Sequence, residues 1–383
     1  MLEHGYRAGA LDWLADALKD RRSRDLHRIL RPRRATDHVL NLASNDYLGL
    51  VKHPAVLHAA CDAVRTFGAG STGSRLVTGT TVLHNQLEDD LAQFVGAESA
   101  LVFSSGYMAN LAVVTALSGR DAVILSDSAS HASLIDACRL SRARIEIFDR
   151  TDLAHVERVL ARRPERRALV VTDSVFSADG AIAPLRALHD VCERYSAVLL
   201  VDEAHGVGVR GAGGRGLVHE VGLSGAPGVV ITATLSKSFA SQGGVVLGPG
   251  AVKDHMIDVA RPFIFDTGLA PSSVAAASAA LKVLREEPER VVAVREHASR
   301  LAAIVGADVP ESAVVSVVLG DPESAVRAAQ EAFARNVHVG CFRPPSVPEG
   351  TSRLRLTARA TLTEDELQLA ETVLEPVLAR ART

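Results

Sequence analysis

Two stretches of the sequence, VLLVDEAH and TATLSK, contain side chains that could act together in catalysis. Lys237 is one of only five lysines, and it shares a turn with the hydroxyls of Thr234 and Ser236. A lysine amine can form a Schiff base with an aldehyde, and neighbouring hydroxyls can bind a phosphate. A carboxylate such as Asp202 can keep a pyridine nitrogen protonated, which lets the ring accept electrons. Together these residues predict an enzyme that binds pyridoxal 5'-phosphate (PLP) as a Schiff base to Lys237.

Further residues could complete such a site. His205 follows Asp202 by three positions and could reach the 3-oxygen of the ring. The segment SSGYMAN combines a strand end, a glycine turn and a helix start, whose free N–H groups favour a phosphate. His131 follows another strand and could stack on the ring. Each residue also has a structural alternative: a surface lysine, a helix-capping aspartate or a structural histidine.

The DEAH sequence at residues 202–205 also occurs in nucleic-acid helicases, where its first acid holds the magnesium ion of ATP. Such ATPases need the phosphate loop GxxxxGK[ST], and none of the five lysines follows a glycine. The formal net charge of -3 provides no positive field for nucleic acid. Two GxGxxG matches, at 68–73 and 206–211, lack the strand–turn–helix context of a dinucleotide site, so we interpret them as tight turns.

Seven short apolar runs must position these side chains. They cover residues 100–106, 121–127, 143–149, 168–177, 197–205, 228–237 and 243–248. The runs are continuously apolar, which is typical of strands buried on both faces of a sheet. Segments with helical spacing separate them, so we predict an α/β fold with a mainly parallel sheet. Ligands bind at the carboxyl ends of such strands, where Asp127, Asp173, Asp202 and Lys237 are candidates.

The pattern changes after about residue 271. Residues 271–306 are rich in Ala, Leu, Glu and Arg and predict helices, and shorter strands and helices follow. The last helix begins with the capping-box spacing of Thr363 and Glu366. We predict an N-terminal arm that joins the small domain (1–44), a large cofactor-binding α/β domain (45–270) and a small C-terminal α+β domain (271–383).

Composition limits the class of protein. Of the 383 residues, 47% are hydrophobic and 23% are charged, as in a globular enzyme with a substantial core. Four scattered cysteines without a CxxC pair argue against a disulfide framework or a zinc site. The N-terminal segment lacks the apolar stretch of a signal peptide, and no apolar run has the length of a membrane span. We expect a cytoplasmic protein with no metal, membrane or nucleic-acid partner.

Eight segments occur in an order that resembles the α-oxoamine synthases, PLP enzymes of aminotransferase fold type I. They are NLASNDYLGL, GAGSTGSRLVTGT, SSGYMAN, SDSASHAS, TDSVFSADGAIAPL, VDEAHGVGVRGAGGRG, TLSKSFASQGG and RPPSVPEGTSRLRLT. The resemblance covers nearly the whole chain, and the spacing of the segments is specific. It implies a large domain with a mainly parallel central sheet, a smaller α+β domain and a homodimer.

The resemblance also implies roles around the cofactor. Lys237 corresponds to the Schiff-base lysine, Asp202 to the acid at the pyridine nitrogen and His205 to the donor to the 3-oxygen. His131 corresponds to a histidine that stacks on the ring and contacts the substrate. The other cofactor-binding positions are Gly106, Tyr107, Ser177, Thr234 and Thr267. Thr267 would reach the cofactor phosphate of the other subunit, which implies a cofactor site at the subunit interface.

Four further residues correspond to substrate positions in the family. Arg343 would hold the carboxylate of the amino acid with its guanidinium, and Ser346 stands where many relatives have Thr. Arg28 corresponds to an N-terminal substrate arginine, and Asn45 lies in a signature segment near the substrate. Phe265 stands where some relatives have Tyr.

Within the family, the short N-terminus and the segment ARPFIFDTGLAPS favour members that condense L-alanine with a pimeloyl thioester in biotin biosynthesis. The thioester carrier could be coenzyme A or acyl carrier protein. The alternatives are sister enzymes that make 5-aminolevulinate or 2-amino-3-ketobutyrate or resemble serine palmitoyltransferase, and a non-catalytic scaffold subunit of the same fold. Arg75 could meet a short dicarboxylic acyl chain, which would favour the 5-aminolevulinate reaction, or it could be a structural ion-pair residue.

Overall fold

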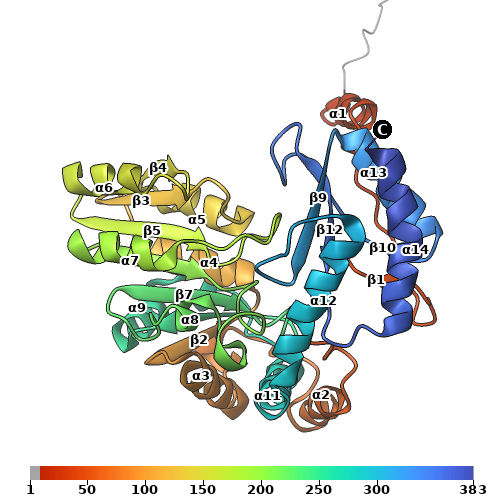
Figure 1. Cartoon of the computed structure of the whole chain (residues 1–383). Coiled ribbons are helices and arrows are strands. Elements are labelled where there is room, and N and C mark those ends of the chain that lie inside the picture. The colour runs from red at the N-terminus through yellow and green to blue at the C-terminus, as the bar shows by residue number, and fades with distance from the viewer. Residues whose placement is uncertain (1–8, 383) are drawn as a thin grey trace, which may run out of the picture.

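The computed structural model describes residues 9–382 and is built around one seven-stranded sheet and two smaller sheets (Figure 1). In spatial order the large sheet contains β2 (Ser99–Phe103), β8 (Gly244–Gly248), β7 (Val229–Thr234), β6 (Val198–Asp202), β5 (Arg167–Asp173), β3 (Ala122–Asp127) and β4 (Arg144–Phe148). Strand β8 is antiparallel to both of its neighbours, and the other pairs are parallel. The predicted α/β fold with a mainly parallel sheet is confirmed. The first eight residues of the predicted N-terminal arm and Thr383 lie outside the described residues.

Each of the seven apolar runs forms one strand, but several strands end before the run does. Strand β6 ends at Asp202, whose Oδ1 accepts the N–H of Ala204 at 2.9 Å. Strand β7 ends at Thr234, whose Oγ1 accepts the N–H of Ser236 at 3.2 Å. In both places a side-chain oxygen accepts the N–H of the residue two positions later, which favours a turn over continuation of the strand. The DEAH and TLSK segments are therefore loops at the carboxyl edge of the sheet.

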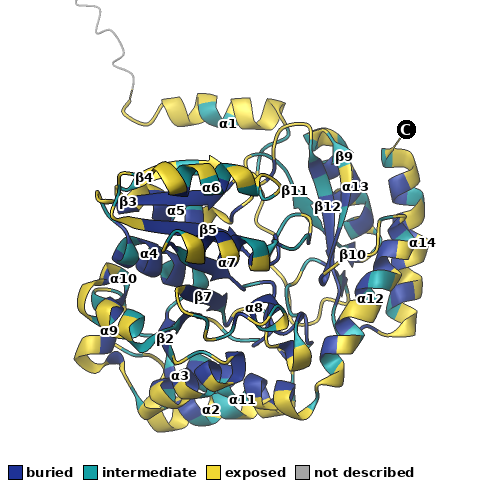
Figure 2. Cartoon of the chain, turned by 60° about the vertical axis from the view of Figure 1, so that its left-hand side comes forward, coloured by how far each residue is buried: buried dark blue, intermediate teal, exposed yellow. Residues whose placement is uncertain are grey.

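Helices cover both faces of the large sheet, and its strands are buried except for the edge strand β4, where Arg144, Ile145 and Ile147 are exposed (Figure 2). The helices and helical turns are α2 (Pro54–Phe67), η1 (Arg75–Gly79), α3 (Val82–Val95), α4 (Gly106–Leu117), α5 (Ala132–Ser141), α6 (Leu153–Arg162), α7 (Leu185–Arg194), η2 (Ala212–Gly214), α8 (Leu217–Glu220), α9 (Gly250–Val259), α10 (Arg261–Ile264) and α11 (Pro271–Glu286). Within β5, Val170 packs into one core, whereas Leu169 and Val171 pack into the core on the other face. This alternation explains the continuous apolar run, since both faces of the strand must be apolar.

A second core lies around the antiparallel sheet β11-β12-β9. Its elements are β9 (Val314–Gly320), β11 (Gly340–Phe342), β12 (Ser352–Thr357), α12 (Glu289–Val305), α13 (Pro322–Ala334) and α14 (Glu364–Ala381). At the start of α14, Thr363 and Glu366 form the predicted capping box. The N-terminal strand β1 (Leu40–Asn41) pairs in parallel with β10 (Val337–His338), and Leu40 and Leu42 belong to this core. The N-terminal helix α1 (Trp13–Ser23) has no buried residue.

The division into domains stays a proposal, and the packing favours one change to it. The buried side chains of α11 belong to the core of the large sheet, together with residues of α2 and α3. Most buried side chains of α12 belong to the second core instead. We therefore place the boundary between α11 and α12, and not at residue 270.

Candidate active site

A cavity of about 250 Å³ lies at the carboxyl ends of β5, β6 and β7. Its lining includes seven of the nine residues that the sequence assigned to the cofactor site, and six others. The predicted residues are Gly106, Tyr107, His131, Asp202, His205, Thr234 and Lys237, and the others are Ser105, Asn110, Ser133, Asp173, Ala204 and Ser236. The fold thus brings together residues that are separated by more than 130 positions in the chain, as expected for strand ends that meet at one edge of a parallel sheet.

Lys237 and His205 are in direct contact. The Nζ atom of Lys237 lies 2.8 Å from Nε2 of His205. Burial lowers the pKa of Lys237 to about 8, Asp202 opposes this shift, and the charge of Arg355 adds to it. Burial also lowers the pKa of His205 well below its ordinary value, with a further contribution from Lys237. His205 is therefore neutral, and Lys237 can lose its proton near neutral pH.

Asp202 is held by two donors. Its Oδ2 accepts the side-chain amide of Asn110 at 2.7 Å, and its Oδ1 accepts the N–H of Ala204. Asn110 itself is fixed by Thr232, whose Oγ1 donates to the Asn110 Oδ1 at 2.6 Å. Asn110 was not predicted from the sequence, although it lies four residues after Gly106 and so on the same face of α4. Its role is to orient the carboxylate of Asp202.

His131 is positioned by Asp173, which pairs in register with Asp202 on the neighbouring strand. The backbone N–H of His131 donates to Oδ2 of Asp173 at 2.9 Å, and Nδ1 of His131 lies 2.7 Å from Oγ of Ser133. Burial raises the pKa of Asp173 well above its ordinary value, and the charge of Asp202 raises it further. Asp173 was a strand-end candidate in the sequence, but its contact with His131 could not be read from the pattern.

The N-terminus of α4 forms one wall of the cavity. Its first residues, Gly106 and Tyr107, line the cavity, and Oγ of Ser105 caps the helix by accepting the N–H of Met108 at 3.1 Å. A Cβ atom on Gly106 would lie only 3.1 Å from Cβ of Thr234, so a larger residue would push Thr234 away. First-turn N–H groups and the helix dipole favour an anion at this position.

These features fit PLP. The cavity presents a buried amine on Lys237, a carboxylate on Asp202 and a helix N-terminus suited to a phosphate, and His131 and Thr234 also line it. A pyridoxal group needs an amine, an acid and an anion site in one enclosed space.

Arg355 lies near this site and was not predicted from the sequence. Arg355 is only 4% exposed, and its guanidinium donates to the carbonyl oxygen of Ser177 at 2.9 Å and to Oδ1 of Asn45 at 2.5 Å. It lies close enough to lower the pKa values of both Lys237 and His205. Ser177 was predicted as a cofactor contact and Asn45 as a substrate contact. Both accept hydrogen bonds from Arg355, and neither lines the cavity.

The predicted substrate arginines lie elsewhere. The guanidinium of Arg343 donates to the backbone carbonyls of Asp25 and His27, and does not line the cavity. Arg343 and Arg28 are neighbours, since the charges of both act on the thiol of Cys341. Ser346 is exposed. Of these three arginines, only Arg355 lies near enough to Lys237 to affect its pKa. Arg343 and Arg28 lie apart from the cavity.

Thr267 lies outside the cavity on an exposed surface. It forms an isolated bridge with Ser74, and the N–H of Gly268 donates to the carbonyl of Gly73, so the two segments lie side by side. Four large apolar side chains on these segments are exposed: Leu76, Val77, Val82 and Phe265.

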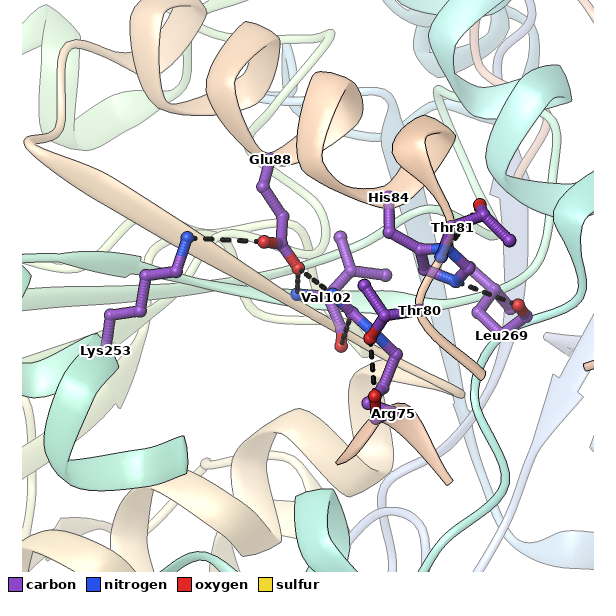
Figure 3. Close-up of polar contacts among 8 residues, drawn as sticks. All are labelled: Arg75, Thr80, Thr81, His84, Glu88, Val102, Lys253 and Leu269. Carbon is purple, nitrogen blue, oxygen red and sulfur yellow. Dashed lines mark hydrogen bonds and ion pairs between the residues drawn. The ribbon is translucent and has the colours of Figure 1, made fainter. Parts of the chain in front are cut away.

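Arg75 is held in a buried polar network (Figure 3). All three of its guanidinium nitrogens donate to the protein: Nε to Thr80 Oγ1, and the other two to the Val102 carbonyl and to Glu88 Oε1, each at 2.9 to 3.0 Å. Glu88 also accepts the N–H of Val102 and the ammonium group of Lys253. Arg75 is buried, and three of its five N–H groups are bound within the protein, one of them to a buried carboxylate, which favours the structural interpretation of this residue.

Comparisons with known proteins agree with this geometry. The profile of the aminotransferase class I and II family matches residues 37–374. A curated relative, the 8-amino-7-oxononanoate synthase of Mycolicibacterium gilvum (strain PYR-GCK), is 64% identical over 378 residues, which cover 98% of this chain and 100% of the relative.

Solved structures show the same similarity. A structure described as SPT with PLP internal aldimine has a TM-score of 0.89 at 29% identity, and covers 97% of this chain and 98% of its own. The 8-amino-7-oxononanoate synthase of Francisella tularensis has a TM-score of 0.77 at 26% identity, over 90% of this chain and 99% of its own. Separately, no helix within residues 9–382 has both the length and the apolar character needed to cross a bilayer.

Proposed function

Because the chain belongs to the aminotransferase class I and II family, and within it to the α-oxoamine synthases, we propose that it condenses L-alanine with a pimeloyl thioester. The products are 8-amino-7-oxononanoate, CO2 and the free thiol, in a step of biotin biosynthesis. The relative that is 64% identical to this chain, and is covered over its full length, is named 8-amino-7-oxononanoate synthase. The observation that carries the proposal is the meeting of Lys237, Asp202 and His205 around one cavity.

The residues of the cavity would hold PLP at several points. Lys237 would hold the aldehyde carbon as a Schiff base, and the first turn of α4 would bind the phosphate together with Thr234. Asp202, oriented by Asn110, would keep the pyridine nitrogen protonated. His131 would lie against the ring. When bound, PLP supplies a ring that accepts the electron pair left on the α-carbon of the amino acid.

The chain's own groups perform the proton transfers. The amino group of L-alanine would replace Nζ of Lys237 at the aldehyde carbon and leave the lysine as a free amine. The pKa of Lys237, which burial lowers to about 8, then allows Nζ to take the α-proton of L-alanine near neutral pH. The α-carbon then forms a bond with the thioester carbonyl, the thiol leaves, the carboxylate leaves as CO2, and Nζ returns the proton. The neutral ring of His205, next to Nζ, would donate to the cofactor's 3-oxygen.

We also propose that Arg355, and not Arg343, binds the carboxylate of L-alanine. A planar guanidinium can bind a carboxylate with two parallel hydrogen bonds. Arg355 affects the pKa of Lys237, whereas Arg343 is bound to backbone carbonyls near residue 25. Arg343, predicted from the resemblance to hold this carboxylate, is the alternative to Arg355, and Arg28 and Ser346 stay predicted substrate contacts.

A homodimer with shared sites is part of the proposal. The exposed apolar side chains beside Thr267 form a surface suited to a second copy of the chain, because large apolar patches on a monomer mark interaction sites. Thr267 would then reach the cofactor phosphate of the other subunit. Tyr107, which lines the cavity and is also exposed, shows that the cavity opens to the surface.

The sister reactions and the scaffold alternative are less well supported. The 5-aminolevulinate reaction was favoured only by Arg75, which is buried and forms an ion pair with Glu88 within the protein. A scaffold subunit would not need a buried lysine with a pKa lowered to about 8.

A grid of amino acids and acyl thioesters separates these reactions. Thiol release is measured for each pair, after the near-visible absorbance of the bound cofactor has been recorded. L-alanine with a pimeloyl thioester, on coenzyme A or acyl carrier protein, is expected to give the highest rate. A higher rate with glycine and a succinyl thioester, or with serine and a long-chain thioester, would reassign the reaction within the family.

A further inference from the structure

Tyr47 is buried beneath the site and has no role in the function described above. It belongs to the second core, and its side chain is fully buried. Its ring lies 6.1 Å from the ring of His205, tilted by 55°. Its hydroxyl group lies 2.5 Å from Nδ1 of His205 and 3.3 Å from Oδ1 of Asn45. The side of the His205 ring that faces away from Lys237 is thus in contact with a phenol.

The phenol has a single proton, which can go to only one of these two acceptors. Oδ1 of Asn45 already accepts a hydrogen bond from Arg355 at 2.5 Å, whereas Nδ1 of His205 is closer to the phenol. Burial raises the pKa of Tyr47, so the phenol stays protonated and can donate. The pKa of His205 is lowered by burial, so the ring is neutral and has one N–H and one acceptor nitrogen.

We propose that Tyr47 donates its phenolic hydrogen to Nδ1 of His205 and thereby keeps the ring proton of His205 on Nε2, the nitrogen next to Lys237. Tyr47 is a positioning residue, since it acts through His205. In the opposite arrangement Nδ1 would donate to Tyr47, and Nε2 could only accept. His205 could then give no hydrogen bond to an oxygen in the cavity, whereas the proposed tautomer can.

The catalytic meaning of this tautomer rests on the proposed function, but the tautomer itself does not. A neutral Nε2–H can donate to the 3-oxygen of the cofactor, which is the role proposed for His205. The hydrogen bond from Tyr47 also fixes the plane of the ring, because it links the ring to a residue of the second core.

Nitrogen NMR of the full chain, labelled with ¹⁵N-histidine, reads the tautomer directly. The signals of His205 are identified by their loss in His205→Gln. The spectra are recorded at about pH 9, above the pKa of about 8 of Lys237, where its unprotonated Nζ can accept the Nε2–H of His205. Nδ1 is expected at the shift of an unprotonated nitrogen and Nε2 at that of a protonated one, both with and without added PLP. A protonated Nδ1 in either state overturns the proposal. The measurement needs no turnover, so a failed thiol-release assay would refute the function and leave the tautomer standing.

Tyr47→Phe tests the positioning role, with Tyr195→Phe as the matched control. The hydroxyl of Tyr195 donates to Glu157 at 3.2 Å, on α6 and away from the cavity. Loss of the buried hydrogen bond in Tyr47→Phe should weaken PLP binding about tenfold and shift the His205 ¹⁵N signals. Tyr195→Phe should change neither. Unchanged signals and unchanged PLP affinity in folded Tyr47→Phe contradict the proposal, and the wild-type spectrum decides the tautomer if this variant does not fold.

Discussion

Replacement of Arg355 by methionine should remove the binding site for the carboxylate of L-alanine. Methionine fills much of the space of the arginine stem and keeps contact with Phe342, over whose ring the guanidinium lies at 4.8 Å. The substitution removes the charge and also leaves the Ser177 carbonyl and the Asn45 amide oxygen without their donor. The matched control is Arg343→Met, because Arg343 was the carboxylate ligand predicted from the sequence.

The size of the effect follows from the hydrogen bonds that are lost. A hydrogen bond to a charged group contributes about 1.5–3 kcal/mol, so a bidentate carboxylate contact contributes at least about 3 kcal/mol. This corresponds to a rise of roughly 100-fold in the KM for L-alanine. The charge of Arg355 also lowers the pKa of Lys237, so its removal should raise that pKa and move the rising limb of the pH–rate profile to higher pH.

The assay is steady-state thiol release with varied L-alanine at a saturating acyl thioester, between pH 6 and pH 10. Arg355→Met is expected to raise the KM for L-alanine, and Arg343→Met is expected to leave it nearly unchanged. Thermal unfolding shows whether each variant is folded. If Arg343→Met raises this KM and Arg355→Met does not, the assignment from the structure is wrong and the one from the sequence is right.

Three further predictions concern stability. Burial lowers the pKa of Lys237 from 10.5 to about 8, so between these pH values the unfolded chain binds more protons than the folded chain. The free energy of unfolding of the cofactor-free chain should therefore rise by about 3 kcal/mol from pH 8 to pH 10.5. Urea unfolding should show that Lys237→Met removes this pH dependence. Burial raises the pKa of Glu203 from 4.5 to about 7, so between these pH values the folded chain binds more protons than the unfolded chain. The free energy of unfolding should therefore fall by about 3 kcal/mol from pH 4.5 to pH 7. In the same urea experiment, the free energy of unfolding of Glu203→Gln should depend less on pH. Arg75→Met breaks a buried ion pair with Glu88 and should cost about 3–5 kcal/mol, seen as a lower Tm, without a change in acyl-chain preference; a changed preference would restore Arg75 as a substrate ligand.

Much of the sheet could be predicted from the sequence, because strands buried on both faces must be continuously apolar. The runs at 168–177 and 197–205 became β5 and β6 for this reason. The position of β8 could not be predicted, since it lies between β2 and β7 although it follows both in the chain. Spatial order depends on how the connecting segments pack, which is not encoded in the apolar pattern of one strand.

The residues that carry the cofactor chemistry could be predicted because they follow strands directly. Lys237 and Asp202 lie at the carboxyl edge, where the topology brings strand ends together. Arg355 could not be chosen in the same way. The segment SRLRLT offers Arg353 and Arg355, and RPPS offers Arg343. Arg353 and Arg355 lie on the same face of β12, and only the packing of this strand beside Ser177 and Asn45 brings Arg355 to the site.

The most direct test of the account follows the carboxyl carbon of L-alanine. Carboxyl-labelled L-alanine is incubated with the purified chain, PLP and a pimeloyl thioester, and labelled CO2 and free thiol are measured together. The account predicts equal amounts of both, dependent on both substrates and absent in Lys237→Ala. Thiol release without labelled CO2, or turnover that persists in Lys237→Ala, would contradict it.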